Sequence, residues 1–138
     1  MESLNNRINA VCENVNFLSS WLIRLGLGIS FIIHGLNKLP LPPQGLIDYF
    51  GFSASLASFV AVSELVAGTI LIIGGFINNY LGNLLTRFGA LLVVVIMAVA
   101  FNIAHRDWFV TTQLFTSEQI FLFLIGLYFL IRGNEEKR

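Results

Sequence analysis

The chain has 138 residues, of which 56% are hydrophobic and only 12% are charged. Soluble domains carry about a quarter charged residues, so this chain has about half of the usual share. The formal net charge is +0 and the cations form no basic run, which excludes a nucleic-acid-binding protein. A chain of this length should form one domain.

Cys12 is the only cysteine of the chain. A single cysteine excludes an internal disulfide, a Cys-x-x-Cys redox pair, a covalent haem-attachment motif and a self-contained iron–sulfur site. Any dithiol chemistry would therefore need cysteines from another protein.

Residues 1–19 are mostly polar but carry a regular apolar pattern. Leu4, Ile8, Val11, Val15 and Leu18 recur at steps of three and four, so a helix would place them on one face. We expect this cytoplasmic segment to be either a short amphipathic helix lying on the membrane surface or a frayed terminus.

Four apolar runs account for most of the remaining chain, at about residues 20–39, 56–77, 84–105 and 114–132. Each has about 20 residues, the length of a helix that crosses the hydrocarbon core of a bilayer. The first run is too long for a signal peptide and lacks a small-residue cleavage site, so we expect it to be retained. The pattern predicts an all-α protein, a membrane four-helix bundle over residues 20–132 followed by a tail at 133–138.

The connection after the first run should contain an interfacial lid. The segment from Pro40 to Pro43 cannot continue a helix, because proline lacks the backbone donor and restricts the preceding residue. Residues 44–55 are apolar but too short to span, with Gly45 and Gly51 as expected turn points.

The other two connections also carry local signals. The turn-rich residues 78–83 make the second and third spans antiparallel neighbours. Thr116 and Gln119 have the spacing of a capping box that opens the last helix. Arg132 and Gly133 are typical of its end.

The distribution of cations predicts the orientation in the membrane. With four spans, both termini lie on one side, together with Arg7, Arg24, Arg87, Arg132, Lys137 and Arg138. The opposite side has Lys38 and Arg106. Because cytoplasmic ends carry the excess of Lys and Arg, we expect a bacterial inner-membrane protein with both termini in the cytoplasm.

Polar residues gather at the outer end of the predicted bundle. Lys38 lies one turn beyond His34 on the same face, and Glu64 falls about two turns into the second span. Asn102 and His105 occupy the last turn of the third span. Ionisable residues inside a membrane usually face a partner or a cavity, so these five predict one site built from three helices.

Individual roles follow from depth. Glu64 lies too deep to reach water easily, so we expect it to be buried and paired with Lys38 or His34. Lys38 could instead extend its ammonium group to the interface. Arg24 and Arg87, about a turn inside the opposite interface, are expected to anchor the bundle at the head groups.

The third span also predicts which side faces the bundle. Arg87 and His105 are about five helical turns apart and therefore share a face. The expected inward line is Arg87, Val94, Ala98, Asn102 and His105. The remaining charges, Arg106, Asp107 and Glu118, are interpreted as ordinary interface residues.

Two further kinds of site fit the same residue types. His34 and His105 could be the axial ligands of a b-type haem held between helices. His34, His105 and Glu64 could bind a metal ion on ligand type alone. No motif supports either alternative, and we expect no metal site.

The order of these residues resembles a known family, the DoxX family of small four-helix membrane proteins. The first-helix residues concerned are Arg24-Leu-Gly-Leu-Gly, Phe31 and His34-Gly-Leu-Asn-Lys38-Leu. Those of the second and third helices are Glu64-Leu-Val-Ala-Gly68, Ile73-Gly-Gly75, Thr86-Arg87-Phe-Gly-Ala and the final His105. The resemblance covers residues 20–132. It implies an association with quinone-linked sulfur oxidation or membrane oxidoreductase complexes for some members, and it implies no role for a particular residue.

The functional prediction combines this resemblance with the polar cluster. We expect a quinone-interacting subunit or a subunit of a membrane oxidoreductase complex, with His34 and Glu64 relaying protons. The ligand-binding residues would be Lys38, Asn102, His105, Phe31 and Phe101. The alternatives are a small proton-coupled transporter and a structural or assembly subunit without catalysis of its own. The expected partners are the lipid bilayer and either a redox protein or a second copy of the chain.

Overall fold

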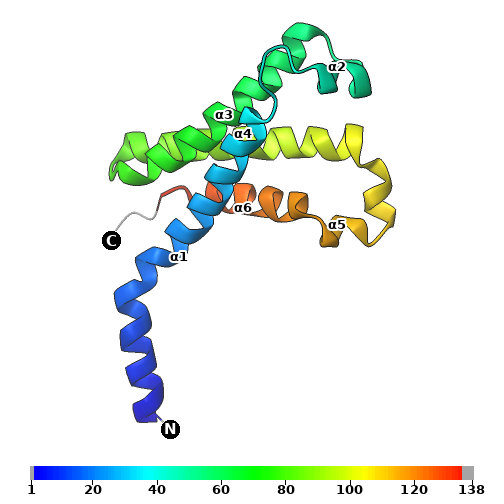
Figure 1. The fold of residues 1–138 in the computed structure, drawn as a ribbon. Helices are drawn as coiled ribbons and strands as arrows, with labels where there is room; N and C mark the ends of the chain where they lie inside the picture. Colours follow the sequence, from blue (N-terminus) through cyan, green and yellow to red (C-terminus); the bar gives the residue numbers. More distant parts are fainter. Residues whose placement is uncertain (1, 135–138) are drawn as a thin grey trace.

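The computed structural model describes residues 2–134, and this range contains helices and no strand. The four long helices are α1 (Glu2–Leu36), α3 (Ala54–Phe76), α4 (Tyr80–Ala104) and α6 (Glu118–Arg132) (Figure 1). Three short helices lie in the connections: α2 (Gln44–Phe50), the 3₁₀ helix η1 (Arg106–Val110) and α5 (Gln113–Thr116). The predicted all-α membrane architecture is confirmed. Residues 135–138 of the expected tail, with Lys137 and Arg138, lie outside the described range.

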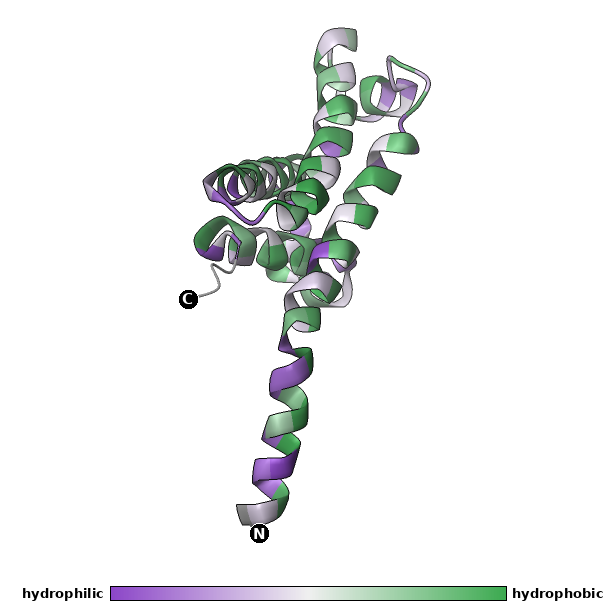
Figure 2. Ribbon diagram, turned by 90° about the vertical axis from the view of Figure 1, so that its left-hand side faces the viewer, coloured by the Kyte–Doolittle hydropathy of each residue, from purple (hydrophilic) through white to green (hydrophobic). Residues whose placement is uncertain are grey.

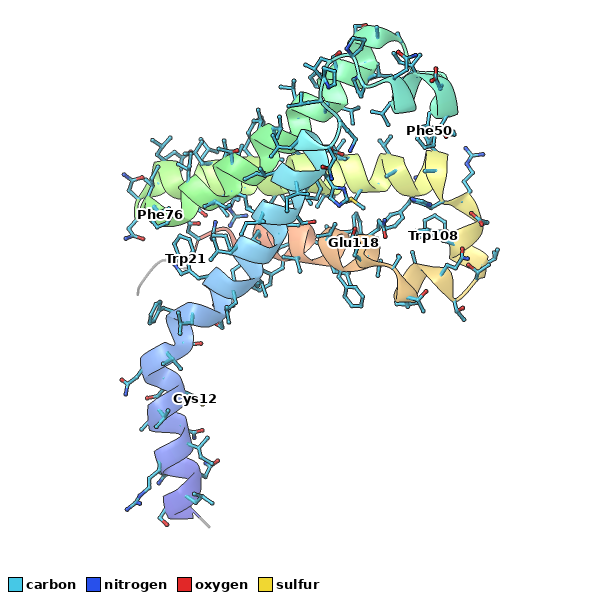
Figure 3. All side chains as sticks on the ribbon, in the orientation of Figure 1. Cys12, Trp21, Phe50, Phe76, Trp108 and Glu118 are labelled. Carbon is cyan, nitrogen blue, oxygen red and sulfur yellow. The ribbon has the colours of Figure 1, made fainter. Side chains whose placement is uncertain are left out.

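α1 joins two segments that the sequence analysis treated separately. One continuous helix contains the polar residues 2–19 and the first apolar run, so the prediction of a frayed terminus is wrong. The polar half projects away from the other helices (Figures 1 and 2). Trp21 marks the point where α1 reaches the bundle, because its ring contacts Phe76 at the end of α3 with centroids 4.5 Å apart (Figure 3).

Small residues bring the helices together. α1 packs mainly on α3, α3 on α4, and α4 on α6. A Cβ atom added to Gly68 of α3 would collide with the carbonyl oxygen of Gly28 on α1, so the two backbones are in direct contact. Gly89 of α4 lies similarly against α3, where an added Cβ would be 3.0 Å from the carbonyl oxygen of Ala67. Such close approach is typical of helices that pack within membranes.

Three helices are long and apolar enough to cross a membrane, residues Ser3–Leu36 within α1, α3 and α4. The fourth predicted span is interrupted at Ser117, which separates α5 from α6. α6 has 15 residues and is therefore about 22 Å long. The predicted capping box is wrong, because the hydroxyl of Thr116 donates to the carbonyls of Thr112 and Gln113 in its own preceding turn. Ser117 is the N-cap residue, and its side chain makes no capping hydrogen bond.

The direction of α6 nevertheless fits a four-helix arrangement. α6 runs antiparallel beside α4 (Figure 1), so that Phe123 contacts Phe101 near one end and Leu130 accepts a hydrogen bond from Arg87 near the other. It thus returns the chain to the end where α3 and α4 are joined. At the opposite end α3 and α4 diverge, and the loop that carries α2 lies there (Figure 1).

The buried face of α4 differs from the predicted one by a single position. The inward line runs through Thr86, Val93, Met97 and Phe101 rather than through Arg87, Val94, Ala98 and Asn102. The small residues Gly82, Gly89 and Ala90 share this buried side. They allow α3 to pack closer to α4 than larger side chains would. In the lid, Gly51 ends α2 in a left-handed conformation with φ of 66° as expected, whereas Gly45 lies inside α2 and makes no turn.

Candidate functional site

A short ion pair joins the first two spans at the diverging end of the bundle. Lys38 Nζ lies 2.6 Å from Glu64 Oε2 and 3.3 Å from the carbonyl oxygen of His34. The side chain of Glu64 is only 9% exposed and that of Lys38 is 22% exposed. α1 ends at Leu36, so Lys38 can turn back over its last turn toward α3. One of the two expected partners of Glu64 is therefore present, and Lys38 does not extend to the interface.

His34 forms a second polar contact, with a residue that the sequence analysis assigned to the interface. His34 Nε2 lies 3.4 Å from Glu118 Oε1 in the first turn of α6. Both side chains are substantially exposed, at 41% and 63%. This pair connects α1 to α6, two helices that otherwise touch little.

A cavity of about 410 Å³ lies beside these pairs, between α1, α2, α3, α4 and α6. Its polar lining consists of His34, Lys38, Ser63, Glu64, His105 and Gln119. The rest of the wall is apolar and includes Phe31, Phe50, Phe52 and Phe59. Phe50 points from α2 toward α4 in Figure 3. Four of the five predicted polar residues, His34, Lys38, Glu64 and His105, thus line this cavity together with Phe31.

Two predicted ligand-binding residues are not at the cavity. Asn102 is exposed, and its amide donates a 2.8 Å hydrogen bond to the carbonyl of Ala98 on its own helix. Phe101 is buried and packs edge-on against Phe109 and Phe123, with centroids 6.0 and 5.8 Å away. Both differences follow from the rotation of α4 by one position.

The ring of His105 stacks on a nearby tryptophan, Trp108. His105 is the residue at which α4 ends, and its ring and that of Trp108 in η1 have centroids 3.7 Å apart and planes 22° apart. Among the residues that the structure describes, no three His, Cys, Asp or Glu side chains are grouped so that they could hold a metal ion. The metal site considered for His34, His105 and Glu64 is therefore not assembled.

A separate polar cluster lies at the other end of the bundle, around Arg24. The guanidinium donates from Nη1 to the carbonyl of Leu71 at 2.7 Å and to the hydroxyl of Thr86 at 2.9 Å, and from Nη2 to Oδ1 of Asn134 at 2.9 Å. It also stacks 4.5 Å from the centroid of Phe129. Arg24 is only 3% exposed, so its predicted extension toward the head groups is wrong.

Asn134 completes this cluster from the end of the described chain. Its Oδ1 also accepts from Thr86 at 2.6 Å, and its Nδ2 donates to the carbonyl of Gly74 at 2.7 Å. Room for Arg24 exists because residue 75 is a glycine, where an added Cβ would lie 2.7 Å from Arg24 Cδ. Arg87 is less buried and donates to the carbonyl of Leu130 at 2.7 Å. Both arginines therefore fasten helix ends.

Buried apolar side chains separate the two polar clusters. Between Arg24 and His34 on α1 lie Leu27 and Phe31, and α4 contributes Val93 and Met97 at the same level. All four belong to one hydrophobic core. The cavity is thus a site at one end of the bundle.

Sequence reasoning missed four participants. Glu118 was assigned to the interface and Gln119 to a helix start, although a helix N-terminus beside a histidine on another span could have indicated a contact. Ser63 precedes Glu64 and gave no signal of its own. Asn134 lies beyond the last apolar run, where an isolated asparagine carries no pattern.

The fold and the site together define a helical membrane protein whose mostly apolar cavity is flanked by a partly buried Lys–Glu pair. The chain belongs to the DoxX family, whose model matches residues 20–106. It is also similar to a Bacillus subtilis (strain 168) protein named "Putative oxidoreductase CatD", with 35% identity over 119 residues that cover 82% of this chain and 83% of that protein. No solved structure matches the chain.

Proposed function

We propose that the chain is a quinone-binding subunit of a membrane oxidoreductase, with the quinone head group in the cavity between α1, α3, α4 and α6. One observation carries the proposal: a cavity of about 410 Å³ with a largely apolar wall has the Lys38–Glu64 pair at its edge. Small-molecule sites in proteins typically combine an apolar lining with a few oriented polar groups. The oxidoreductase name of the Bacillus subtilis relative agrees with this class of function.

The polar groups fit the needs of a quinone head group. Lys38 can donate a hydrogen bond to one carbonyl oxygen, and His105 can donate to another from the α4 side of the cavity. Reduction of a quinone to a quinol takes up two electrons and two protons. A redox partner protein would supply the electrons, and Glu64 and His34 can pass the protons.

The different exposures of Glu118 and Glu64 favour a proton route that leads from Glu118 through His34 to the cavity. Glu118 and His34 are open to the surroundings, whereas Glu64 is enclosed at the cavity wall. A proton would therefore enter at Glu118, pass to His34, and reach the head group beside Lys38 and Glu64. The aromatic wall formed by Phe31, Phe50 and Phe59 offers flat apolar surface for the ring.

The test uses a fluorescent reporter that the chain already contains. Trp108 stacks on the cavity residue His105, whereas Trp21 lies at the far end of α3 against Phe76 (Figure 3). Addition of a short-chain quinone should quench W21F protein, which retains Trp108, much more strongly than W108F protein. Membrane lipid extracted with the purified wild-type chain should contain quinone.

Variants at the cavity should weaken this quenching. K38M should raise the apparent Kd about tenfold, because the hydrogen bond from the ammonium group to a quinone carbonyl oxygen is lost. N102A is the matched control, since Asn102 lies at the same depth on α4 but outside the cavity. The proposal is wrong if no quinone co-purifies and W21F and W108F proteins are quenched alike.

A further inference from the structure

The free half of α1 carries an apolar stripe that no other part of the described chain covers. Leu4, Ile8, Val11, Val15 and Leu18 are between 43% and 65% exposed. The stripe continues without a break into the part of α1 that packs on the bundle. There its members are Leu22, Leu25 and Ile29, which are also exposed.

The spacing of this stripe is that of a coiled-coil seam. Its steps alternate between four and three residues from Leu4 to Ile29, which is a heptad repeat with Leu4 at a d position. The a positions hold Ile8, Val15, Leu22 and Ile29, and the d positions hold Leu4, Val11, Leu18 and Leu25. β-Branched residues at a with leucine at d favour two parallel strands.

The bundle does not obstruct this seam. On α1 the buried residues Arg24, Leu27 and Phe31 face the other helices; Arg24 and Phe31 occupy c positions and Leu27 an f position. The c and f positions lie away from a and d, whereas Trp21 and Gly28, at g positions, contact α3 beside the seam. A partner helix can therefore lie along α1 most freely over residues 4–18, before α1 reaches the bundle. Figure 2 shows hydrophobic and hydrophilic residues alternating along the free part of α1, consistent with a one-sided stripe.

A membrane-surface location is difficult to reconcile with the continuity of α1. A helix that crosses the bilayer and continues unbroken beyond it leaves the membrane, so its apolar residues enter water. A helix that lies flat on the surface would require a sharp turn near residue 20, whereas α1 is helical throughout Glu2–Leu36 and only bends between its two halves (Figure 1). A partner helix is therefore the better cover for the stripe.

We propose that a second copy of this chain covers the stripe, forming a parallel, in-register coiled coil of two α1 helices. Two copies inserted in the same membrane have the same orientation, so their α1 helices are parallel, as a two-fold axis along the membrane normal requires. The flanking positions permit this pairing. In a parallel dimer Arg7 at g faces Cys12 of the partner at e, and Asn14 faces Ser19, so no like charges oppose each other.

Cysteine cross-linking tests the register directly. In a C12S background, L4C, V11C and L18C place a thiol at successive d positions, and E13C places one at an f position on the outer side of the same helix. Mild oxidation of isolated membranes should convert each d variant to a disulfide-linked species of twice the chain mass. E13C should give at least tenfold less.

The pattern of cross-links distinguishes the arrangements. Only a parallel, in-register pair can link residue 4 to residue 4 and also residue 18 to residue 18, because an antiparallel pair brings identical residues together at a single central level. Adding V15D should abolish cross-linking of the L18C protein, while quinone quenching reports whether the bundle is intact. Cross-linking no stronger than that of E13C, or products whose mass requires a different protein, would overturn the proposal.

Discussion

Arg24 illustrates how a cation can be accommodated inside a bundle of apolar helices. Its guanidinium has three protein acceptors, from the backbone of Leu71 and the side chains of Thr86 and Asn134. A rigid, planar group with several donors can bond to all three at once, which a lysine ammonium on a flexible stem does less well. The arginine thus links α1 to α3, α4 and the segment that follows α6.

Replacing Arg24 should therefore affect stability more than a typical charge replacement. R24A removes three hydrogen bonds at a buried site, so that the Leu71 carbonyl, the Thr86 hydroxyl and the Asn134 side chain each lose one donor, and we expect a loss of about 3 kcal/mol in the free energy of unfolding. R24K should retain part of that stability, because it keeps the charge but not the fork of donors. Thermal unfolding in detergent measures both.

A suitable control for Arg24 is R106A. Arg106 is an exposed cation whose Nε donates to the carbonyl of Asn102. Exposed substitutions usually change stability by less than about 0.5 kcal/mol. Equal losses in R24A and R106A would contradict a structural role for the Arg24 cluster.

Single residues of the site show how much of it could be predicted from the sequence. Depth and spacing were sufficient to indicate that Glu64 has a buried partner and that Lys38 is a candidate. They were insufficient for Asn102, because a rotation of α4 by about 100° per residue moves a side chain from the bundle to the lipid. The contact of His34 with Glu118 depends on where α6 begins, which tertiary packing decides.

At the scale of elements, the contact between α1 and α3 depends on Gly28 and Gly68. The two helices carry His34, Lys38 and Glu64, so their separation fixes the geometry of the Lys–Glu pair. A larger side chain at Gly68 would meet backbone atoms of α1, which cannot move aside as the tip of a flexible side chain can. The close packing of these helices is therefore a condition for the site.

Two alanine substitutions should have opposite effects on stability. G68A should destabilise the protein and weaken quinone quenching, because the new Cβ collides with the carbonyl oxygen of Gly28. G26A should be neutral or stabilising by about 0.5–1 kcal/mol, since alanine favours helix and nothing lies within 4 Å of its added Cβ. Both glycines lie inside spans, so unfolding in one detergent compares them directly. A stable G68A protein with normal quenching would show that the contact is dispensable.

Element prediction succeeded where hydrophobicity alone decides and failed where local chemistry competes. The apolar runs identified α3 and α4 to within a few residues. The last run was predicted as one helix, yet the hydroxyl of Thr116 bonds within its own turn and the chain breaks at Ser117. The polar half of α1 was left open between two alternatives, and the observed helix continues through both halves.

The whole molecule has two ends with different roles. One end contains the Arg24 cluster, the turn between α3 and α4, and Asn134, and the free half of α1 projects beyond it. The other end contains the cavity, the lid with α2, and the segment from η1 to α5. α6 begins beside His34, and the chain just after it reaches Arg24. α6 therefore passes along the same hydrophobic core as α1, although it is shorter than α1, α3 and α4. A short helix can cross where the bilayer thins around it.

This arrangement, with the excess of cations at the Arg24 end, predicts that both termini face the cytoplasm and that the lid faces the opposite side. In a C12S background, E13C should react with a membrane-impermeant maleimide only in inverted vesicles. Y49C should react in intact cells, because Tyr49 on α2 is 85% exposed. A reporter fused after the last residue should behave as E13C does if α6 completes a fourth crossing. If the reporter and Y49C instead share a side, α6 lies within one leaflet and the cavity is bounded by three spanning helices.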